Sequence, residues 1–236
     1  MHSARSMVTQ GLFDTDRFLV DSRVDALRQS FSHDEYVRLP LLLTSEGLDV
    51  LRAEATRMES YATRRDFLME SMDNSPRHMT TIGGHIITEH STLIPALYED
   101  EALVHLIRSI AAIDIVPVPD VVERFVINYL HKPQDVHGAH FDDHPVAFVA
   151  FLESPPPGCG GELELVPGAR SLSEIASPRA RRHHHLPGDC YLLRSDRAAH
   201  RVSPLLAPSR RVVLNMAFAS PESARIVSPS ASLLYS

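Results

Sequence analysis

The sequence is poor in cysteine, in long apolar runs and in positive charge. Its two cysteines, Cys159 and Cys190, cannot form a disulfide framework. No apolar run approaches the length of a membrane span, and the formal net charge of −7 argues against a nucleic-acid binder, which usually has a basic face. The N-terminal residues also lack an apolar segment long enough for export. We therefore expect a protein of the reducing cytoplasm that binds neither membranes nor nucleic acids.

The first half of the chain predicts mainly helices. Residues 45–67 begin with a serine that can start a helix, and apolar residues from Leu48 to Met58 recur at helical spacing. Residues 91–111 predict a second helical region. Between them, residues 72–85 contain a proline and a Gly-Gly pair, which predict a loop.

The character of the sequence changes near residue 120. Short runs rich in Val, Leu, Phe and Tyr follow, separated by Pro, Gly and Asp clusters, which is typical of an antiparallel sandwich, barrel or jelly roll. We expect an α+β fold in a single domain, residues 1–236. Residues 1–118 would form a mainly helical cover on one face of a sheet, and residues 119–236 the β core. The arginine- and histidine-rich residues 181–185 are expected in a solvated loop.

Three side chains form a candidate metal site. His140 and Asp142 lie two positions apart, so in an extended segment both side chains point to one face. His200 follows much later, just beyond an apolar run. Two imidazoles and one carboxylate are the facial triad that suits non-heme Fe(II) and leaves three coordination positions open. The H-x-D pair alone is weak evidence, because such pairs also occur by chance in surface turns.

The order of the motifs is more specific. The H-x-D pair is followed by "GGELELVPG", "PGDCYLL", His200 and an arginine on a last apolar strand. This order resembles the Fe(II)- and 2-oxoglutarate-dependent oxygenase superfamily, whose fold is a double-stranded β-helix, a cupin-like jelly roll. The stretches "SPRHM", "GGHIITEHSTLIPALYED", "VVERFVINYL", "HGAHFDDH" and "VVLNMAF" resemble the BesD-like family, from about residue 70 to the C-terminus. Members of that family halogenate or hydroxylate free amino acids, notably lysine.

The resemblance implies a role for each candidate residue. His140, Asp142 and His200 would bind Fe(II), with 2-oxoglutarate and O₂ as co-substrates. Six residues match positions that hold the amino acid: Arg77 for its carboxylate, Glu123 on the strand "VVERF" for its amine, and His137, Asp143, Asn215 and Tyr235, the last as an aromatic lid. Charge supports this assignment, because a buried zwitterion needs an arginine at one end and carboxylates at the other. The alternative for Glu123 is an exposed charge on an edge strand.

Strand alternation bears on the co-substrate site. In "RRVVLNMAF", Arg211 and Asn215 share one face, so we favour Arg211 over Arg210 as the 2-oxoglutarate ligand; a one-residue bulge would reverse this choice. The same alternation places Glu123 and Tyr129 on one face. Tyr129 would then either reach the co-substrate or lie in the core.

Asp142 favours hydroxylation over halogenation. In the halogenating relatives a small residue replaces this carboxylate, and chloride takes the vacant iron position. A carboxylate at residue 142 excludes chloride by geometry and charge. Ala217 stands where lysine-acting relatives tend to have a hydroxyl, yet Glu123 and Asp143 still favour a cationic substrate. We therefore expect the substrate to be a basic amino acid, with lysine ranked first, then ornithine or a related compound.

Two other functions fit the same motifs. One is a non-enzymatic, cupin-like metal-binding module, which would keep the triad without needing Arg77, Glu123 or Arg211. The other is an oxygenase that acts on a carrier-bound, peptidyl or other small-molecule substrate; Arg77 argues against a tethered amino acid, which has no free carboxylate. The sequence predicts no oligomeric state.

Overall fold

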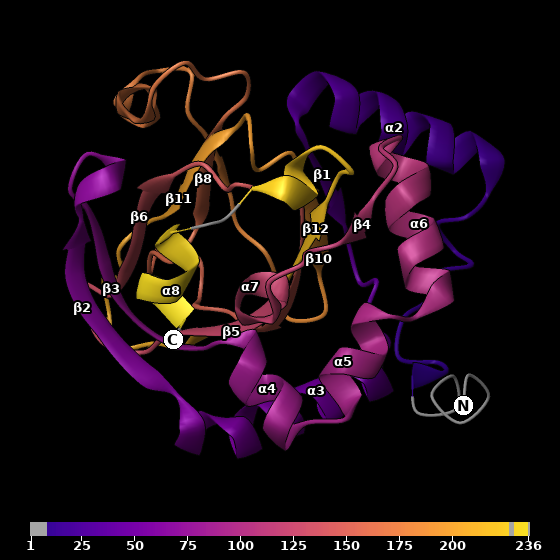
Figure 1. Cartoon of the computed structure of the whole chain (residues 1–236), viewed down its shortest axis with the longest axis horizontal. Helices are drawn as coiled ribbons and strands as arrows, with labels where there is room; N and C mark the ends of the chain where they lie inside the picture. Colours follow the sequence, from indigo (N-terminus) through magenta and orange to yellow (C-terminus); the bar gives the residue numbers. More distant parts are fainter. Residues whose placement is uncertain (1–8, 227–228, 236) are drawn as a thin grey trace.

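The computed structural model describes residues 9–226 and 229–235, and its strands form a single curled sheet (Figure 1). The strands are β1 (Tyr36–Leu39), β2 (Thr63–Met69), β3 (Ser75–Ile82), β4 (Val116–Pro117), β5 (Phe125–Leu130), β6 (Val136–His140), β7 (Val146–Glu153), β8 (Leu163–Val166), β9 (Arg181–His183), β10 (Cys190–Leu193), β11 (Ala199–Val202) and β12 (Arg211–Ala219). Their order is β1-β10-β7-β12-β5-β3-β6-β11-β8-β9, with β2 on β3 and β4 on β12. All of these pairings are antiparallel, as the sequence predicts.

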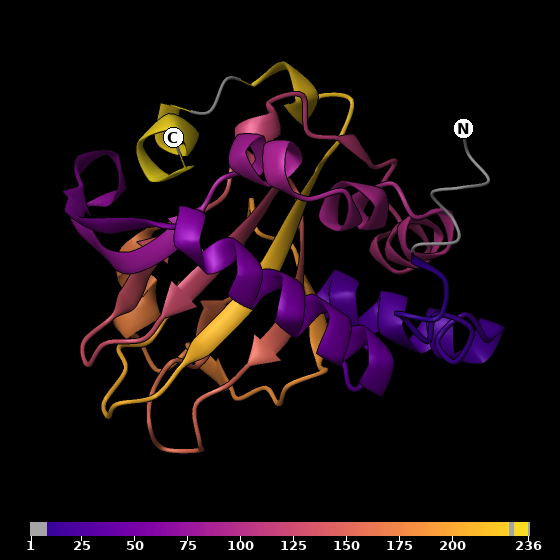
Figure 2. The same ribbon diagram turned by 90° about the horizontal axis from the view of Figure 1, so that it is seen from below.

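Most of the helices cover one face of this sheet. The α-helices of the described residues are α2 (Asp21–Asp34), α3 (Ser45–Met58), α4 (Gly84–His90), α5 (Leu93–Tyr98), α6 (Glu101–Ala111), α7 (Val121–Arg124) and α8 (Pro229–Tyr235). Buried side chains from α2 to α6 pack with those of β5, β7, β10 and β12 in the main apolar core. Figure 2 shows this helical layer beside the sheet, whereas α8 lies apart from it, over the curled side of the sheet. The predicted α+β fold with helices on one sheet face is confirmed.

Strand β12 shows how the sequence separates the two faces. Val212, Leu214 and Met216 belong to the helix-side core. Val213 belongs to a second apolar cluster inside the curl of the sheet, and Asn215 lies on the same inner face. Because side chains alternate along a strand, the apolar-rich run can fill both faces at once.

Two helix starts depend on side-chain caps. Asp100 accepts a hydrogen bond from the backbone N–H of Leu103 at 2.9 Å, and Thr44 accepts one from that of Gly47 at 2.9 Å. Such caps satisfy N–H groups that have no partner within the helix. Among the described residues, no helix has the length and apolar character needed to cross a membrane.

Two local predictions are wrong. Residues 72–85 do not form a loop, because Ser75–Ile82 is strand β3, which pairs with β2, β5 and β6. Pro76 stands near the start of this strand, where a missing N–H is tolerated, and the β-branched residues that follow favour an extended chain. The helix expected over 45–67 ends at Met58, and β2 begins at Thr63. Residues 1–118, predicted to be mainly helical, therefore supply strands β1 to β4 to the sheet.

Candidate active site

His140, Asp142 and His200 converge at one point. His140 is the last residue of β6 and is directly paired with His200 of β11, while Asp142 follows β6 by two residues. One carboxylate oxygen of Asp142 lies 3.5 Å from Nε2 of His140 and 3.9 Å from Nε2 of His200. One ligand atom from each of the three residues can be chosen so that all lie within 4.8 Å of one another. No other group of this kind occurs among the residues that the structure describes.

Hydrogen bonds orient both imidazoles. Nδ1–H of His140 donates to the carbonyl of Gly138 at 2.8 Å, and Nδ1–H of His200 donates to that of Ala198 at 2.9 Å. Each bond leaves the Nε2 lone pair facing the shared space, as metal-binding histidines require. Burial, together with the nearby His200 and His137, lowers the pKa of His140 well below its usual value, so its ring is neutral.

Asp142 supplies the carboxylate of this donor set. Its side chain is 31% exposed, and its backbone N–H donates to the carbonyl of Ser195 at 2.9 Å. Burial raises the pKa of Asp142, while His200 and the Ser195 hydroxyl oppose the rise. Two imidazoles and a carboxylate are a donor set that fits Fe(II).

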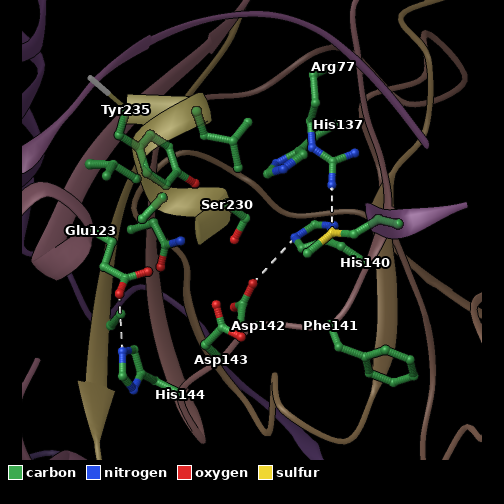
Figure 3. A pocket seen from close by; sticks show the side chains of 16 residues that line it. Arg77, Glu123, His137, His140, Phe141, Asp142, Asp143, His144, Ser230 and Tyr235 are labelled. Atoms are coloured by element: carbon green, nitrogen blue, oxygen red, sulfur yellow. Dashed lines mark hydrogen bonds and ion pairs between the residues drawn. The ribbon is translucent and has the colours of Figure 1, made fainter. Parts of the chain in front are cut away.

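The six residues assigned to substrate line one pocket, whose wall also includes His140 and Asp142 (Figure 3). They come from β3, α7, β6, the segment after β6, β12 and α8: Arg77, Glu123, His137, Asp143, Asn215 and Tyr235. The structure thus brings together positions that span most of the chain. Within this pocket, the buried Nε2 of His137 and Oδ1 of Asn215 have no hydrogen-bond partner among the described residues.

Arg77 is completely buried in the wall of this pocket. Its guanidinium donates to Ser75 Oγ at 2.9 Å and to the carbonyl of Pro76 at 3.1 Å, but its Nε has no partner among the described residues. Burial lowers the pKa of Arg77 to about 10, and nearby Tyr235 and Asp142 limit the decrease. No carboxylate of the described residues forms an ion pair with it.

Helix α8 closes the pocket on one side. Arg65 of β2 donates to the carbonyl of Leu234 at 2.7 Å. Gly83 packs directly under the last turn, where a Cβ would lie 2.1 Å from the carbonyl oxygen of Tyr235. Because only glycine allows this approach, the α8 backbone is held close to the end of β3.

Arg211 is buried on the inner face of β12. Its guanidinium lies 4.9 Å from the ring centroid of Phe151 and forms a hydrogen bond with Tyr191. The described residues offer it no ion pair. Arg210, in contrast, points to the helix side and pairs with Glu59 at 3.0 Å and Glu153 at 3.1 Å. The alternation predicted for this strand therefore holds, and Arg210 does not reach the inner face of the sheet.

Tyr129 does not reach the co-substrate site either. Its hydroxyl donates to the carbonyl of Ala55 in α3 at 2.7 Å, and its ring belongs to the helix-side core. Glu123 does not share a strand with it, because Val121–Arg124 forms the single turn α7 and β5 begins at Phe125. The helical turn breaks the alternation, so Glu123 reaches the pocket while Tyr129 faces away.

Sequence reasoning missed two histidines. His185, expected in a solvated loop, is only 2% exposed; it stacks on Phe151 with ring centroids 4.4 Å apart, and its Nε2 lies 2.8 Å from the Tyr36 hydroxyl. His144 lies in the pocket wall beside Glu123. No periodicity in the sequence indicates that His185 is buried. The place of His144 in the polar run "HFDDH" was the available signal that it belongs to the site.

The fold agrees with solved structures that include a non-heme, α-ketoglutarate-dependent enzyme and a protein with bound 2-oxoglutarate. SnoN, an α-ketoglutarate-dependent epimerase from nogalamycin biosynthesis, has a TM-score of 0.66 at 15% identity over 85% of this chain and 84% of SnoN. HygX from Streptomyces hygroscopicus, with nickel and 2-oxoglutarate bound, has a TM-score of 0.65 at 14% identity over 83% of this chain and 87% of HygX. A Pseudomonas putida prolyl-4-hydroxylase has a TM-score of 0.58 at 16% identity over 84% of this chain and 98% of the hydroxylase.

The fold is therefore that of the Fe- and 2-oxoglutarate-dependent oxygenases. The sequence is more specific, because the model of the Halogenase D family matches residues 19–229. The chain belongs to the Halogenase D family. No protein of curated function matches the chain in sequence.

Proposed function

We propose that the protein is an Fe(II)- and 2-oxoglutarate-dependent oxygenase that hydroxylates a free basic amino acid. The observation that carries the proposal is a pair of buried guanidinium groups, Arg77 and Arg211, which form no ion pair with any described residue. A buried charge is costly unless it is paired, so each of them calls for an anion. A free amino acid brings one carboxylate to the pocket of Arg77. 2-Oxoglutarate brings another to Arg211.

The residues of the chain have distinct tasks in this reaction. His140, Asp142 and His200 would hold the iron, and bound Fe(II) with 2-oxoglutarate and O₂ supplies an oxidant that can break an unactivated C–H bond. Arg77 binds the substrate carboxylate through its forked donors. Glu123, at the α7 end of the pocket, accepts hydrogen bonds from the substrate ammonium. Holding both ends fixes which carbon faces the metal site.

Asp142 supports hydroxylation as the outcome. The family takes its name from a halogenase, and by the resemblance noted above the halogenating relatives have a small residue at this position. Here a carboxylate lies within 3.9 Å of both imidazole nitrogens. It occupies the position that chloride would need, and its negative charge repels the anion.

Two acidic residues support a basic side chain in the substrate. Glu123 and Asp143 both line the pocket with Asn215. Ala217, also in the pocket wall, offers no hydroxyl to a polar substrate group. Lysine and ornithine are therefore the first candidates. An oxygenase of carrier-bound amino acids would leave Arg77 without its anion.

Two experiments test this function. Anaerobic addition of Fe(II) and 2-oxoglutarate to the purified protein should produce a weak visible charge-transfer band that requires both. Its absence would favour a non-enzymatic metal-binding module or a zinc site. A screen of the common amino acids and ornithine with iron, 2-oxoglutarate and ascorbate should then give a mass gain of one oxygen on a basic amino acid. A gain only on neutral amino acids, or chlorination, contradicts the proposal.

A further inference from the structure

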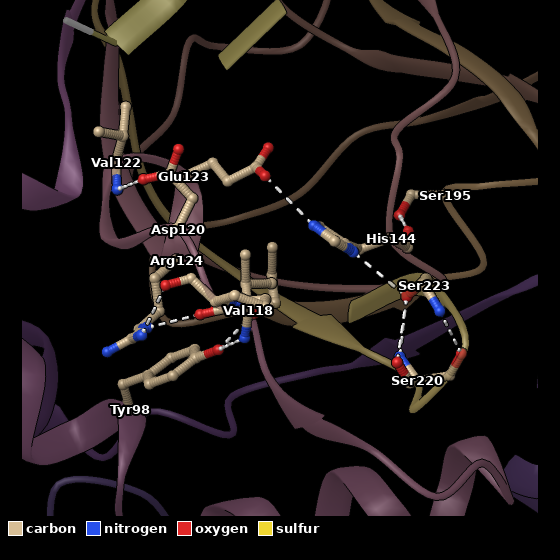
Figure 4. Close-up of polar contacts among 12 residues, drawn as sticks. Tyr98, Val118, Asp120, Val122, Glu123, Arg124, His144, Ser195, Ser220 and Ser223 are labelled. Atoms are coloured by element: carbon tan, nitrogen blue, oxygen red, sulfur yellow. Dashed lines mark hydrogen bonds and ion pairs between the residues drawn. The ribbon is translucent and has the colours of Figure 1, made fainter. Parts of the chain in front are cut away.

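His144 connects Glu123 to the segment that follows β12 (Figure 4). Its Nε2 lies 3.2 Å from Oε1 of Glu123, and its Nδ1 lies 3.2 Å from Oγ of Ser223. The side chain of His144 is only 3% exposed, and its carbonyl accepts a hydrogen bond from the Ser195 hydroxyl at 3.0 Å. Although it follows Asp142 by two positions, it is not in the metal-ligand group. Figure 3 shows its ring directed at Glu123 instead.

The backbone of Glu123 is fixed without His144. Asp120 caps α7 by accepting from the backbone N–H of Val122 at 2.9 Å, and Arg124 donates to the carbonyl of Val118 at 2.9 Å. Gly84 packs against the same turn, where a Cβ would lie 1.9 Å from the carbonyl oxygen of Val121. These contacts set where the glutamate side chain starts, but its rotatable bonds leave the carboxylate free to move. Among the described residues, His144 is the partner that restrains it.

One tautomer of His144 satisfies both of its side-chain contacts. Ser223 Oγ accepts from the backbone N–H of Ser220 at 2.9 Å, so its own proton can point to Nδ1 of His144. An imidazole that accepts at Nδ1 carries its hydrogen on Nε2 and can donate it to the Glu123 carboxylate. The two contacts of the ring therefore restrain the carboxylate in the pocket wall.

We propose that His144 is a positioning residue, which aims the Glu123 carboxylate at the cationic end of the substrate and thereby sets the preference for a basic side chain. The inference rests on the proposed function for the identity of the substrate. His144 acts through Glu123 and touches neither the metal site nor the reacting carbon. Hydrogen bonds to charged groups are strong enough that losing this one should weaken recognition of the ammonium roughly 10- to 100-fold.

Two substitutions of His144 distinguish the contact made by Nε2 from the contact made by Nδ1. In His144→Gln the amide nitrogen can stand in for Nε2 and still donate to Glu123. In His144→Asn the shorter side chain stands in for Nδ1, keeps Ser223 within reach and loses Glu123. The readout compares lysine with norleucine, which lacks only the terminal ammonium. His131→Phe, a substitution just after the opposite end of β5, controls for general effects of replacing a partly buried histidine.

The expected result is specific to recognition of the cation. His144→Asn should raise the KM for lysine roughly 10- to 100-fold, with kcat for norleucine and the KM for 2-oxoglutarate unchanged, whereas His144→Gln and His131→Phe should resemble the wild type. Equal lysine KM values in all four proteins would overturn the proposal. So would a parallel loss of lysine affinity, 2-oxoglutarate affinity and thermal stability in both His144 variants, because that pattern indicates a purely structural role.

A structural measurement keeps the two proposals distinguishable. If the wild type shows no preference for lysine over norleucine, the proposed substrate class fails. The positioning role is then decided by crystal structures of wild type and His144→Asn with iron and 2-oxoglutarate. A Glu123 carboxylate that turns away from the pocket in the variant supports it, and one in the same place in both proteins overturns it.

Discussion

His140 and His200 are directly opposite each other on β6 and β11, and their ring centroids lie 4.1 Å apart. The pairing register shifts between His200 and Val202, so an irregularity of the ladder lies beside the site, where β-bulges are frequent. Antiparallel pairing brings the two rings together, and Asp142 completes the group from the segment that leaves β6. The cross-strand pair would thus supply two of the three metal ligands from adjacent strands.

Replacing Asp142 with glycine should abolish hydroxylation. The substitution removes one of the three metal ligands. Residues that only hydrogen-bond to metal ligands already change metal affinity or activity about 10- to 100-fold when they are replaced. We therefore expect turnover to fall by more than about 100-fold and iron binding to weaken. Product mass and anaerobic iron titration measure the two effects. The vacated position is open to chloride or azide. If Asp142→Gly hydroxylates at the wild-type rate, this carboxylate is not a ligand.

Replacing Arg77 with alanine should remove the requirement for a free carboxylate. The wild type should prefer lysine to lysinamide, because only lysine offers an anion to the buried guanidinium. In Arg77→Ala we expect the KM for lysine to rise roughly 100-fold and the preference for lysine over lysinamide to disappear. Steady-state kinetics with both compounds provide the measurement. Nearly unchanged lysine turnover would instead indicate a tethered substrate.

The neighbouring arginines of β12 offer a matched comparison. Arg211→Ala should raise the KM for 2-oxoglutarate roughly 100-fold, because it removes the buried partner of a carboxylate. Arg210→Ala should leave that KM unchanged. Its ion pairs with Glu59 and Glu153 are partly solvated, with the Arg210 side chain 40% exposed, so their loss should cost only about 0–1 kcal/mol of stability. Similar effects of the two substitutions on 2-oxoglutarate would refute the inward assignment of Arg211.

The fold and the metal triad could be predicted because their signals are local or periodic. Strand alternation placed Arg211 inside and Arg210 outside, and the H-x-D spacing brought His140 and Asp142 to one face. The failures have tertiary causes. The β-branched run "VVERFV" predicts a strand, but Asp120 caps a helical turn there, and the contacts of Arg124 hold it.

Other features could not be obtained from the sequence at all. The proline and glycines of residues 72–85 indicate a loop, yet pairing with β2 and β6 makes an extended strand the better solution. His185 is buried only because Tyr36 and Phe151, from distant parts of the chain, meet around it. The residues that precede it, 181–184, are all polar and do not reveal this.

His185 should make stability depend on pH. Burial, with Arg211 nearby, lowers the pKa of His185 to about 2, whereas an unfolded chain titrates near 6.5. Between these values the unfolded chain binds one more proton than the folded one, so the free energy of unfolding falls as the pH falls below about 6.5. This residue contributes up to about 1.4 kcal/mol per pH unit.

The substitution His185→Gln isolates this contribution. Its amide nitrogen can keep the contact with Tyr36 but cannot titrate, so the variant should lose stability less steeply between pH 6.5 and pH 5 than the wild type does. Denaturant unfolding at several pH values in this range measures both slopes. The other buried histidines remain in both proteins and cancel in the comparison. Identical slopes would mean that His185 can take up a proton in the folded protein, or that an unseen rearrangement exposes it to water.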